Sequence, residues 1–277
     1  MNTTATAPAN PSSIVLTGVT KHYAGNTALS KVNMRVEQGE FVVLLGPSGA
    51  GKSTIFRCIT ALTAPDHGKV EVLGERIDQL GKRDLRIARR GIGLIFQQLN
   101  LIGRISALKN VLAGRLGYVS AWRVLLHLFP EQDRQQALAN LDRIGLLNHA
   151  YQRADSLSGG QQQRVAIARA LSQQSRVILA DEPVSSLDPE SSETVLEILR
   201  GISHERGIGV LCSLHQVDLA KRFADRIIGV RAGSVVFDGT AADLDDAALE
   251  RIYRNRPRSE QYSSESSVEL ETQPEPA

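Results

Sequence analysis

The sequence predicts an α/β fold with a mainly parallel sheet, and three apolar runs carry that prediction. Residues 41–45 (FVVLL) lie between glycine-containing segments, as expected of a strand buried on both faces. Residues 177–180 and 208–212 have the same apolar character. Helical patterns separate these runs, and an alternation of strands with helices is typical of a parallel sheet.

Helical periodicity follows the first two of these strands. Ile55, Ile59 and Leu62 recur at the spacing of one helix face, so a helix is expected after the glycine-rich segment. Asp188 and Pro189 predict the N-cap and first turn of another helix. Between these two helices, residues from about 98 to 175 contain helical patterns and few strand signals, which predicts an inserted helical subdomain.

A small antiparallel β-subdomain is expected beside the main sheet, from strand patterns at residues 14–19, 32–36 and 69–73. The predicted domain spans residues 13–256. Residues 1–12, with prolines among small polar residues, are expected to be a flexible leader. Residues 257–277 contain five glutamates and one arginine among serines and prolines, so they are expected to form a disordered acidic tail.

Composition excludes several classes of protein. The 277 residues carry 32 Lys and Arg against 30 Asp and Glu, and the net charge of +2 argues against nucleic-acid binding through a broad basic surface. Cys58 and Cys212 cannot make a disulfide framework, so a reducing cytoplasm is expected and both are interpreted as small core residues. No run of about 20 apolar residues could span a bilayer, and the start lacks a signal-peptide pattern.

A phosphate-binding loop is predicted between the first buried strand and its helix. Residues 46–53 (GPSGAGKS) fit the pattern G-x-x-x-x-G-K-[ST], in which glycines let backbone N–H groups approach an anion at a helix N-terminus. Lys52 can then reach the β- and γ-phosphates, and the Ser53 hydroxyl can bind Mg²⁺. The nucleotide-binding residues predicted here are Gly46, Pro47, Ser48, Gly49, Ala50, Gly51, Lys52, Ser53 and Thr54.

Two carboxylates, Asp181 and Glu182, end the second buried strand. Asp181 is expected to hold Mg²⁺ directly or through water, and Glu182 to lie where water attacks the γ-phosphate. A carboxylate beside an attacking water can act as a general base. The pair could instead cap the turn at Pro183, but the nearby phosphate-loop motif favours the catalytic interpretation.

A second helix start suited to phosphate follows residue 157. Ser158 is placed as an N-cap, and Gly159 and Gly160 would let the N–H groups of the turn that includes Gln161 approach an anion. One bound nucleotide does not need two such helix starts. Their presence is explained if two copies of the chain pair and each completes the other's site.

These motifs together resemble the ATP-binding-cassette (ABC) ATPases over roughly residues 14–256. The resemblance implies a P-loop NTPase fold with a RecA-like parallel-sheet core. It also implies a head-to-tail homodimer that binds two ATP molecules with Mg²⁺. Residues 158–161 and Asp188 would complete the site of the opposite protomer.

The resemblance also implies roles for residues outside these motifs. Tyr23 matches the aromatic that stacks on adenine, Gln97 the glutamine that contacts Mg²⁺, and His215 the histidine that contacts the γ-phosphate. The catalytic residues implied are Glu182, His215 and Gln97, and the implied magnesium ligands are Ser53, Gln97 and Asp181. Taken singly, each has an ordinary alternative, such as a surface aromatic for Tyr23 or a strand-end histidine for His215.

Segments outside the ATP site resemble the phosphonate-import ATPases of the PhnC type. They are residues 96–104, 110–117, 122–123, 128–129, 214–220 and 252–254. This resemblance implies the ATP-hydrolysing, energy-coupling subunit of a bacterial importer, peripheral on the cytoplasmic face of the inner membrane. Its partners would be two membrane permease subunits and, indirectly, a periplasmic or lipid-anchored phosphonate-binding protein. Ser185 replaces an expected alanine, and Leu99 replaces a common aromatic near the groove that receives the permease's coupling helix.

Other cargoes and roles stay open on the sequence. The importer could carry phosphite, phosphate esters or polar amino acids, or the chain could serve a phosphonate-degradation complex without transport. Lys52 and Ser158 lie too close in sequence to hold the long coiled coils of DNA-repair relatives, and a single cassette argues against a translation factor. The basic residues 82–90 are expected to be a solvated loop.

Overall fold

The computed structural model describes residues 12–120, 123 and 129–253. Residues 1–11 of the predicted leader and the whole predicted acidic tail lie outside the described residues, as do residues 122, 128 and 254 of the PhnC-like segments. None of the helices in the described part of the chain is long and apolar enough to cross a membrane.

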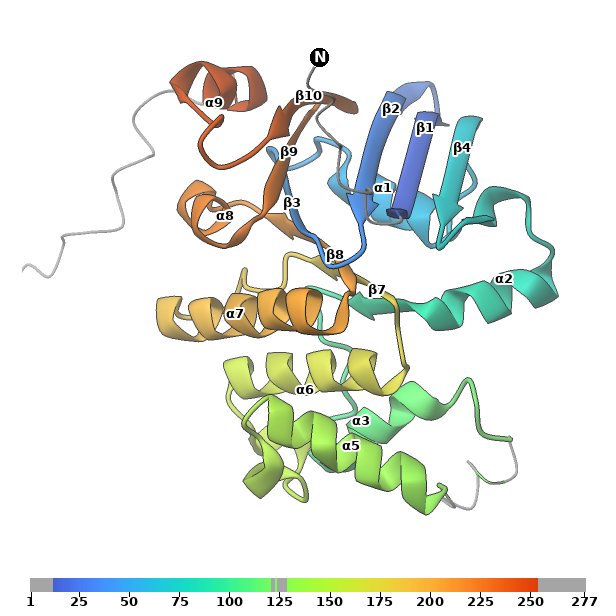
Figure 1. Cartoon of the computed structure of the whole chain (residues 1–277), viewed down its shortest axis with the longest axis vertical. Helices are drawn as coiled ribbons and strands as arrows, with labels where there is room; N and C mark the ends of the chain where they lie inside the picture. Colours follow the sequence, from blue (N-terminus) through green and yellow to red (C-terminus); the bar gives the residue numbers. More distant parts are fainter. Residues whose placement is uncertain (1–11, 121–122, 124–128, 254–277) are drawn as a thin grey trace, which may run out of the picture.

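A six-stranded sheet in the order β10-β9-β3-β8-β7-β6 forms the centre of the molecule (Figure 1). Its first five strands along the chain run parallel, and only the last, β10, is antiparallel to its neighbour. The strands are β3 Phe41–Leu45, β6 Ile92–Ile95, β7 Val177–Asp181, β8 Gly209–Leu214, β9 Arg226–Arg231 and β10 Ser234–Gly239. The predicted parallel strands are therefore confirmed.

A second, antiparallel sheet has the order β2-β1-β4-β5. Its strands are β1 Ser12–Tyr23, β2 Asn26–Glu37, β4 His67–Val72 and β5 Glu75–Arg76. The predicted short strands are present and extend further, because β1 and β2 continue to a tight turn between Tyr23 and Asn26. Helix α1, Lys52–Ile59, lies beside this sheet (Figure 1).

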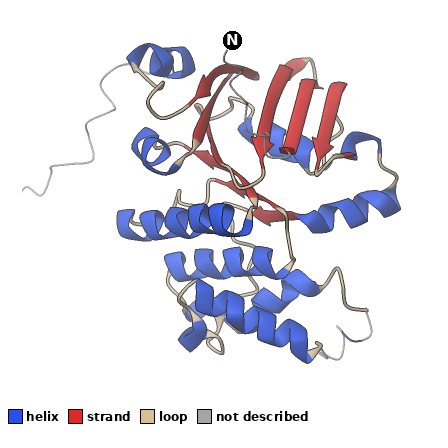
Figure 2. Ribbon diagram, in the orientation of Figure 1, coloured by secondary structure: helices blue, strands red, loops and turns tan. Residues whose placement is uncertain are grey.

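Helices fill the chain between β6 and β7, and the described residues there add no strand to either sheet (Figure 2). Eight α-helices are described: α1, α2 Lys82–Ala88, α3 Ala107–Leu112, α5 Glu131–Arg143, α6 Gly159–Ser172, α7 Pro189–Arg206, α8 Val217–Phe223 and α9 Asp246–Tyr253. Short 3₁₀ helices are η1 Ile77–Gln79, η2 Arg89–Gly91, η3 Ala113–Arg115, η4 Leu147–His149 and η5 Ala154–Ser156.

Successive side chains of β3 point into two different cores, which explains why every residue of this strand is apolar. Phe41, Val43 and Leu45 belong to a core that extends into α3, α5, α6 and α7. Val42 and Leu44 belong to a second core, which includes α1 and the antiparallel sheet. A strand covered on both faces has no position where a polar side chain could reach water.

Two local expectations were wrong. Helix α1 ends at Ile59, and Leu62 lies beyond it with 61% of its surface exposed, so Leu62 does not continue the buried stripe. Residues 82–88 form helix α2, not a solvated loop, because Leu85 and Ala88 pack against the second core while Lys82 and its basic neighbours stay exposed. Both cysteines are buried, as expected.

Candidate functional site

The phosphate loop connects β3 to α1, and its glycines are required by sterics. A Cβ on Gly46 would lie 2.2 Å from the Val230 carbonyl oxygen, and a Cβ on Gly51 would lie 2.9 Å from that of Ala28. Gly51 also has a φ of 111°, in the left-handed region that favours glycine. The loop can therefore approach its neighbours only with glycine at these positions.

The N-terminus of α1 has no capping side chain and no acidic residue of its own. Gly51 provides no side-chain cap, and the first turn contains no acidic residue. The first N–H groups of a helix have no intrahelical acceptor, and the aligned peptide dipoles make that end positive. The geometry fits the phosphates of a nucleotide, which would supply the missing acceptors.

Lys52 lies inside this loop, with only 5% of its surface exposed. Its Nζ donates to the carbonyl oxygens of Gly46 at 2.6 Å and Pro47 at 3.2 Å. An ammonium group has three donors, so one stays available for a phosphate oxygen. Burial lowers the pKa of Lys52, and the negative charges of Glu182 and Asp181 act in the opposite direction. The side chain is thus anchored and close to the carboxylates.

The carboxylates lie at the end of β7 and are linked to β8 by Ser213. The Ser213 hydroxyl donates to Asp181 Oδ1 at 2.8 Å and accepts from the backbone N–H of Glu182, also at 2.8 Å. Glu182 has a φ of 50°, a left-handed conformation that costs a non-glycine residue about 1–3 kcal/mol. His215, just after β8, contacts the Glu182 carboxylate through Nε2. The parallel pairing of β7 and β8 brings all four residues together.

Ser213 was not singled out from the sequence. It is fully buried and is the one hydroxyl residue in the otherwise apolar strand GVLCSL. That interruption of an apolar strand is the signal that could have identified it.

The carboxylate edge also fits the ligand chemistry of Mg²⁺. No group of three or more His, Cys, Asp and Glu side chains that could hold a metal ion occurs within residues 12–120, 123 and 129–253. Mg²⁺ commonly binds through one or two carboxylates together with phosphates and waters, so it does not need such a cluster. Asp181 and the Ser53 hydroxyl supply suitable oxygens. Gln97 is exposed just beyond β6, the strand that pairs with β7.

Tyr23 lies at the end of β1, in the antiparallel sheet, and is distant in sequence from the residues that follow β6, β7 and β8. Its hydroxyl donates to Thr63 Oγ1 at 3.3 Å, and the Lys21 ammonium lies 5.5 Å from its ring centroid. Tyr23 is 38% exposed, so solvent reaches this side chain. Its predicted contact with adenine stays a prediction.

The second helix start has the predicted cap. Ser158 Oγ accepts from the Gln161 N–H at 3.3 Å, and the Gln161 side chain accepts from the Ser158 N–H at 2.9 Å. Asp188 caps the adjacent helix α7 by accepting from the Ser191 N–H at 2.9 Å. In the described part of the chain, none of the hydrogen bonds or ion pairs joins residues 158–161 to residues 46–54.

Gly160 has a role that the sequence did not indicate. A Cβ on Gly160 would lie 2.7 Å from Ser191 Oγ, so this glycine lets the N-termini of α6 and α7 pack closely. Gly159 is less restricted, because a Cβ at that position would lie 3.4 Å from Leu187 Cδ2, an ordinary contact distance. The absence of a side chain at residue 160 is thus needed for packing, whereas its role in binding an anion stays a prediction.

Residues 29–185 match the family model described as ABC transporter. The chain belongs to the ABC transporter family of ATP-binding proteins. It has the ABC cassette fold of a P-loop NTPase, as expected, and it is an ABC-type ATPase.

Several curated ABC proteins are similar over most of the chain. The hypophosphite import ATP-binding protein HtxD of Stutzerimonas stutzeri is 49% identical over 239 residues, which cover 86% of this chain and 70% of that protein. The phosphonates import ATP-binding protein PhnC of Frankia casuarinae is 50% identical over 247 residues, covering 89% and 98%. PhnC 3 of Halalkalibacterium halodurans is 49% identical over 234 residues, covering 84% and 91%.

Solved ABC cassettes have the same fold. The dimeric structure of MJ0796, a bacterial ABC transporter cassette, is 37% identical, has a TM-score of 0.72 and covers 82% of this chain and 98% of its own. A post-hydrolysis state of MJ0796 bound to ADP and Pi is 36% identical, has a TM-score of 0.71 and covers the same shares.

Proposed function

We propose that this chain is the energy-coupling ATPase of a bacterial importer for phosphonates. The observation that carries the ATPase mechanism is the convergence of Lys52, Asp181, Glu182 and His215 beside the uncapped N-terminus of α1. The cargo is supported by the identity of about half of the aligned residues to phosphonate import proteins. Because a hypophosphite import protein is equally similar, hypophosphite is the second candidate cargo.

The phosphate loop would bind the ATP phosphates, with Lys52 on the β- and γ-phosphates and Tyr23 against adenine. Mg²⁺, held by Ser53, Gln97 and Asp181, would neutralise phosphate charge. Glu182 would orient the attacking water and accept its proton, which is typically worth about 10²–10⁴ in rate. His215 contacts the Glu182 carboxylate, so it can fix the orientation of Glu182. It would also contact the γ-phosphate.

The two helix starts support a head-to-tail homodimer. In a single chain, residues 158–161 make no hydrogen bond to the phosphate loop within the described residues, and the start of α6 presents N–H groups and a positive dipole end. Each ATP would lie between the phosphate loop of one protomer and this α6 start of the other. ATP would hold the dimer closed, and cleavage of the γ-phosphate would weaken the bridge. The resulting opening would be the mechanical output.

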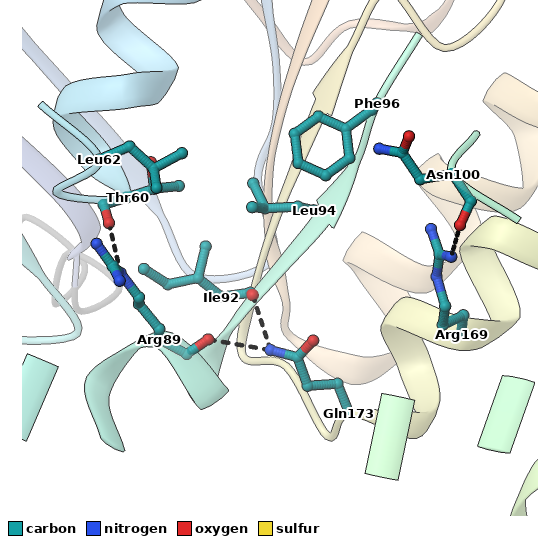
Figure 3. Close-up of a pocket in the computed structure, with 9 residues that line it drawn as sticks. All are labelled: Thr60, Leu62, Arg89, Ile92, Leu94, Phe96, Asn100, Arg169 and Gln173. Atoms are coloured by element: carbon teal, nitrogen blue, oxygen red, sulfur yellow. Dashed lines mark hydrogen bonds between the residues drawn. The ribbon is translucent and has the colours of Figure 1, made fainter. Parts of the chain in front are cut away.

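A groove of about 390 Å³ offers a place for the permease (Figure 3). Its lining residues are Thr60, Leu62, Arg89, Ile92, Leu94, Phe96, Asn100, Arg169 and Gln173. Leu62 and Phe96 are 61% and 38% exposed at its rim, and an apolar helix face could cover them. One groove per protomer would accept one of two permease subunits, placing the dimer on the cytoplasmic face of the inner membrane. A binding protein outside would deliver the cargo.

Uptake in a deletion strain tests the proposal. The strain is grown with methylphosphonate, 2-aminoethylphosphonate or hypophosphite as the sole phosphorus source and complemented with the wild type or with Glu182→Gln. Radiolabelled uptake is measured in parallel. Import restored by the wild type and not by the variant is expected, and the compound taken up identifies the cargo. Uptake unaffected by the deletion would contradict a transport role.

A further inference from the structure

The two helices whose N-termini are suited to phosphate have C-termini that meet at one segment of the molecule. Helix α1 ends at Ile59 and α6 ends at Ser172, and both ends contact the turn formed by η2 and the start of β6, residues 89–92. The contacts are made by two side chains that line the groove, Arg89 and Gln173 (Figure 3). We call this pair the polar bracket.

Arg89 joins the bracket to α1. Its Nε donates to the Thr60 carbonyl at 2.9 Å, and its Nη2 donates to the Ala61 carbonyl at 3.0 Å. The carbonyls at a helix C-terminus lack intrahelical donors and carry the negative end of the helix dipole. A guanidinium in this position therefore both satisfies the acceptors and fixes the end of α1 to the η2 turn.

Gln173 joins the same turn to α6. Its Nε2 lies 3.0 Å from the Arg89 carbonyl, 3.1 Å from that of Arg90 and 2.9 Å from that of Ile92, and it donates to them. Gln173 is also the C-cap residue of α6, with its backbone N–H bonded to the Arg169 carbonyl. A shift of the end of α6 would therefore break bonds to the turn that holds α1.

The end of α6 is held from the helical side as well. The Tyr118 hydroxyl donates to the Gln173 carbonyl at 3.0 Å, and Arg169 donates to the Leu99 and Asn100 carbonyls, both at 2.8 Å. Gly114 packs against the same end of α6, because a Cβ on Gly114 would lie 2.3 Å from the Arg169 carbonyl oxygen. These contacts leave little room for the end of α6 to move relative to the segment after β6.

We propose that Gln173 is a positioning residue that makes α1 and α6 move together when the groove is occupied. The inference rests on the proposed function, because it takes a permease segment as the occupant. In the proposed dimer the N-terminus of α1 faces the ATP of its own protomer, and the N-terminus of α6 faces the ATP of the other. A linkage between the C-termini of these two helices therefore connects the groove to both ATP sites. Loss of the linkage separates ATP hydrolysis from the permease and leaves hydrolysis itself intact.

The decisive variant is Gln173→Met, which keeps the length of the side chain and removes both donors. In vesicles that contain the full chain, its permease and a cargo-loaded binding protein, the stimulation of ATPase rate over the free chain is expected to fall about fivefold or more. The basal ATPase rate and the ATP affinity of the free chain are expected to stay within about twofold, because the side-chain bonds of Gln173 go to residues 89–92 and not to the predicted nucleotide-binding residues. Gln173→Lys, which restores donors, is expected to recover much of the stimulation.

Gln135→Met is the matched control, since Gln135 lies on the exposed face of α5. Equal stimulation in Gln173→Met and the wild type would overturn the inference. A fall in basal rate together with a lower melting temperature would overturn it too, because Gln173 would then only support the fold.

A second measurement needs no permease. In the full chain carrying Glu182→Gln, ATP is expected to slow amide hydrogen exchange at residues 89–92, the turn that Gln173 contacts, as well as in the phosphate loop. Adding Gln173→Met is expected to abolish the change at 89–92 and retain that in the loop. An unaltered response at 89–92 would refute the linkage. If the wild type is not stimulated by the permease, the transport proposal fails, and this exchange experiment still decides the role of Gln173.

Discussion

The imidazole of His215 contacts the carboxylate of Glu182, a residue 33 positions earlier in the chain. Both side chains lie at the carboxyl ends of neighbouring parallel strands, where the buried Ser213 bonds to the backbone of Glu182. The proposed general base is therefore held from two sides by contacts within the protein. A preset orientation lowers the cost of assembling the site during the reaction.

Replacing Glu182 by Gln should preserve ATP binding and nearly abolish turnover. The amide retains the shape of the side chain but cannot accept a proton, so a loss of about 10²-fold or more in kcat is expected. ATP should then trap a closed dimer, visible by light scattering. Glu197→Gln, on the exposed surface of α7, is the control. Normal hydrolysis in Glu182→Gln would remove Glu182 from the catalytic role.

Lys52→Ala should weaken nucleotide binding itself. Hydrogen bonds to charged groups contribute about 1.5–3 kcal/mol, so the Kd for ATP is expected to rise about tenfold or more. Titration calorimetry with ATP measures the effect, and Lys109→Ala, at an exposed position on α3, serves as the control. An unchanged Kd would mean that the third donor of Lys52 does not reach a phosphate.

Ser158→Arg should block closure of the dimer without affecting the phosphate loop. A long cation would replace the cap of α6 and occupy the space expected for the partner's nucleotide. ATP should bind with near-normal affinity, while the cooperative dependence of the ATPase rate on protein concentration should disappear. Ser120→Arg provides an exposed comparison. Intact cooperative hydrolysis in Ser158→Arg would show that the shared-site dimer is wrong.

Asp66 should stabilise the fold in a pH-dependent way. Its carboxylate accepts from Lys21 Nζ at 2.8 Å and from the His22 N–H at 2.6 Å, and the Lys21 bond, followed by the His22 bond, lowers the pKa of Asp66 to about 2. A carboxyl in an unfolded chain has a pKa of about 3.9. The stabilisation is therefore fully present above about pH 4 and is lost as the pH falls toward 2.

Urea unfolding tests this expectation with Asp66→Asn. At pH 7 the variant should have a lower free energy of unfolding than the wild type, and the difference should shrink between about pH 4 and pH 2. Asp142→Asn, at an exposed position on α5, controls for the change in net charge. A difference that is independent of pH would show that the charge of Asp66 does not matter.

Local sequence determined much of the fold and of the nucleotide site. The apolar run of β3, the capping pair Asp188 and Pro189, and the Ser158 cap act over a few residues, so their patterns can be interpreted without the tertiary structure. The glycines of the phosphate loop belong to the same group. Their φ values and close approaches are those of a tight strand-to-helix turn.

Other features depended on contacts between distant parts of the chain. Residues 82–88 are mostly good helix formers, yet only the structure shows that they form α2, with Leu85 and Ala88 packed on the second core. Leu62 fits a helical stripe in the sequence, yet α1 has ended before it and its side chain is exposed. Ala61, between the end of α1 and Leu62, has a φ of 50°, outside the helical region, and the spacing of apolar residues did not reveal that break.

The sequence by itself determined that this chain has a phosphate loop, a carboxylate pair and a second capped helix start, because each is a continuous motif set by backbone sterics and local hydrogen bonds. Only the tertiary structure decided that Ser213 and His215 hold Glu182, that Gly160 must admit Ser191, and that Arg89 and Gln173 join the ends of two helices. Those relationships arise where strands and helices far apart in sequence are packed side by side, and the spacing of residues along the chain does not encode that proximity.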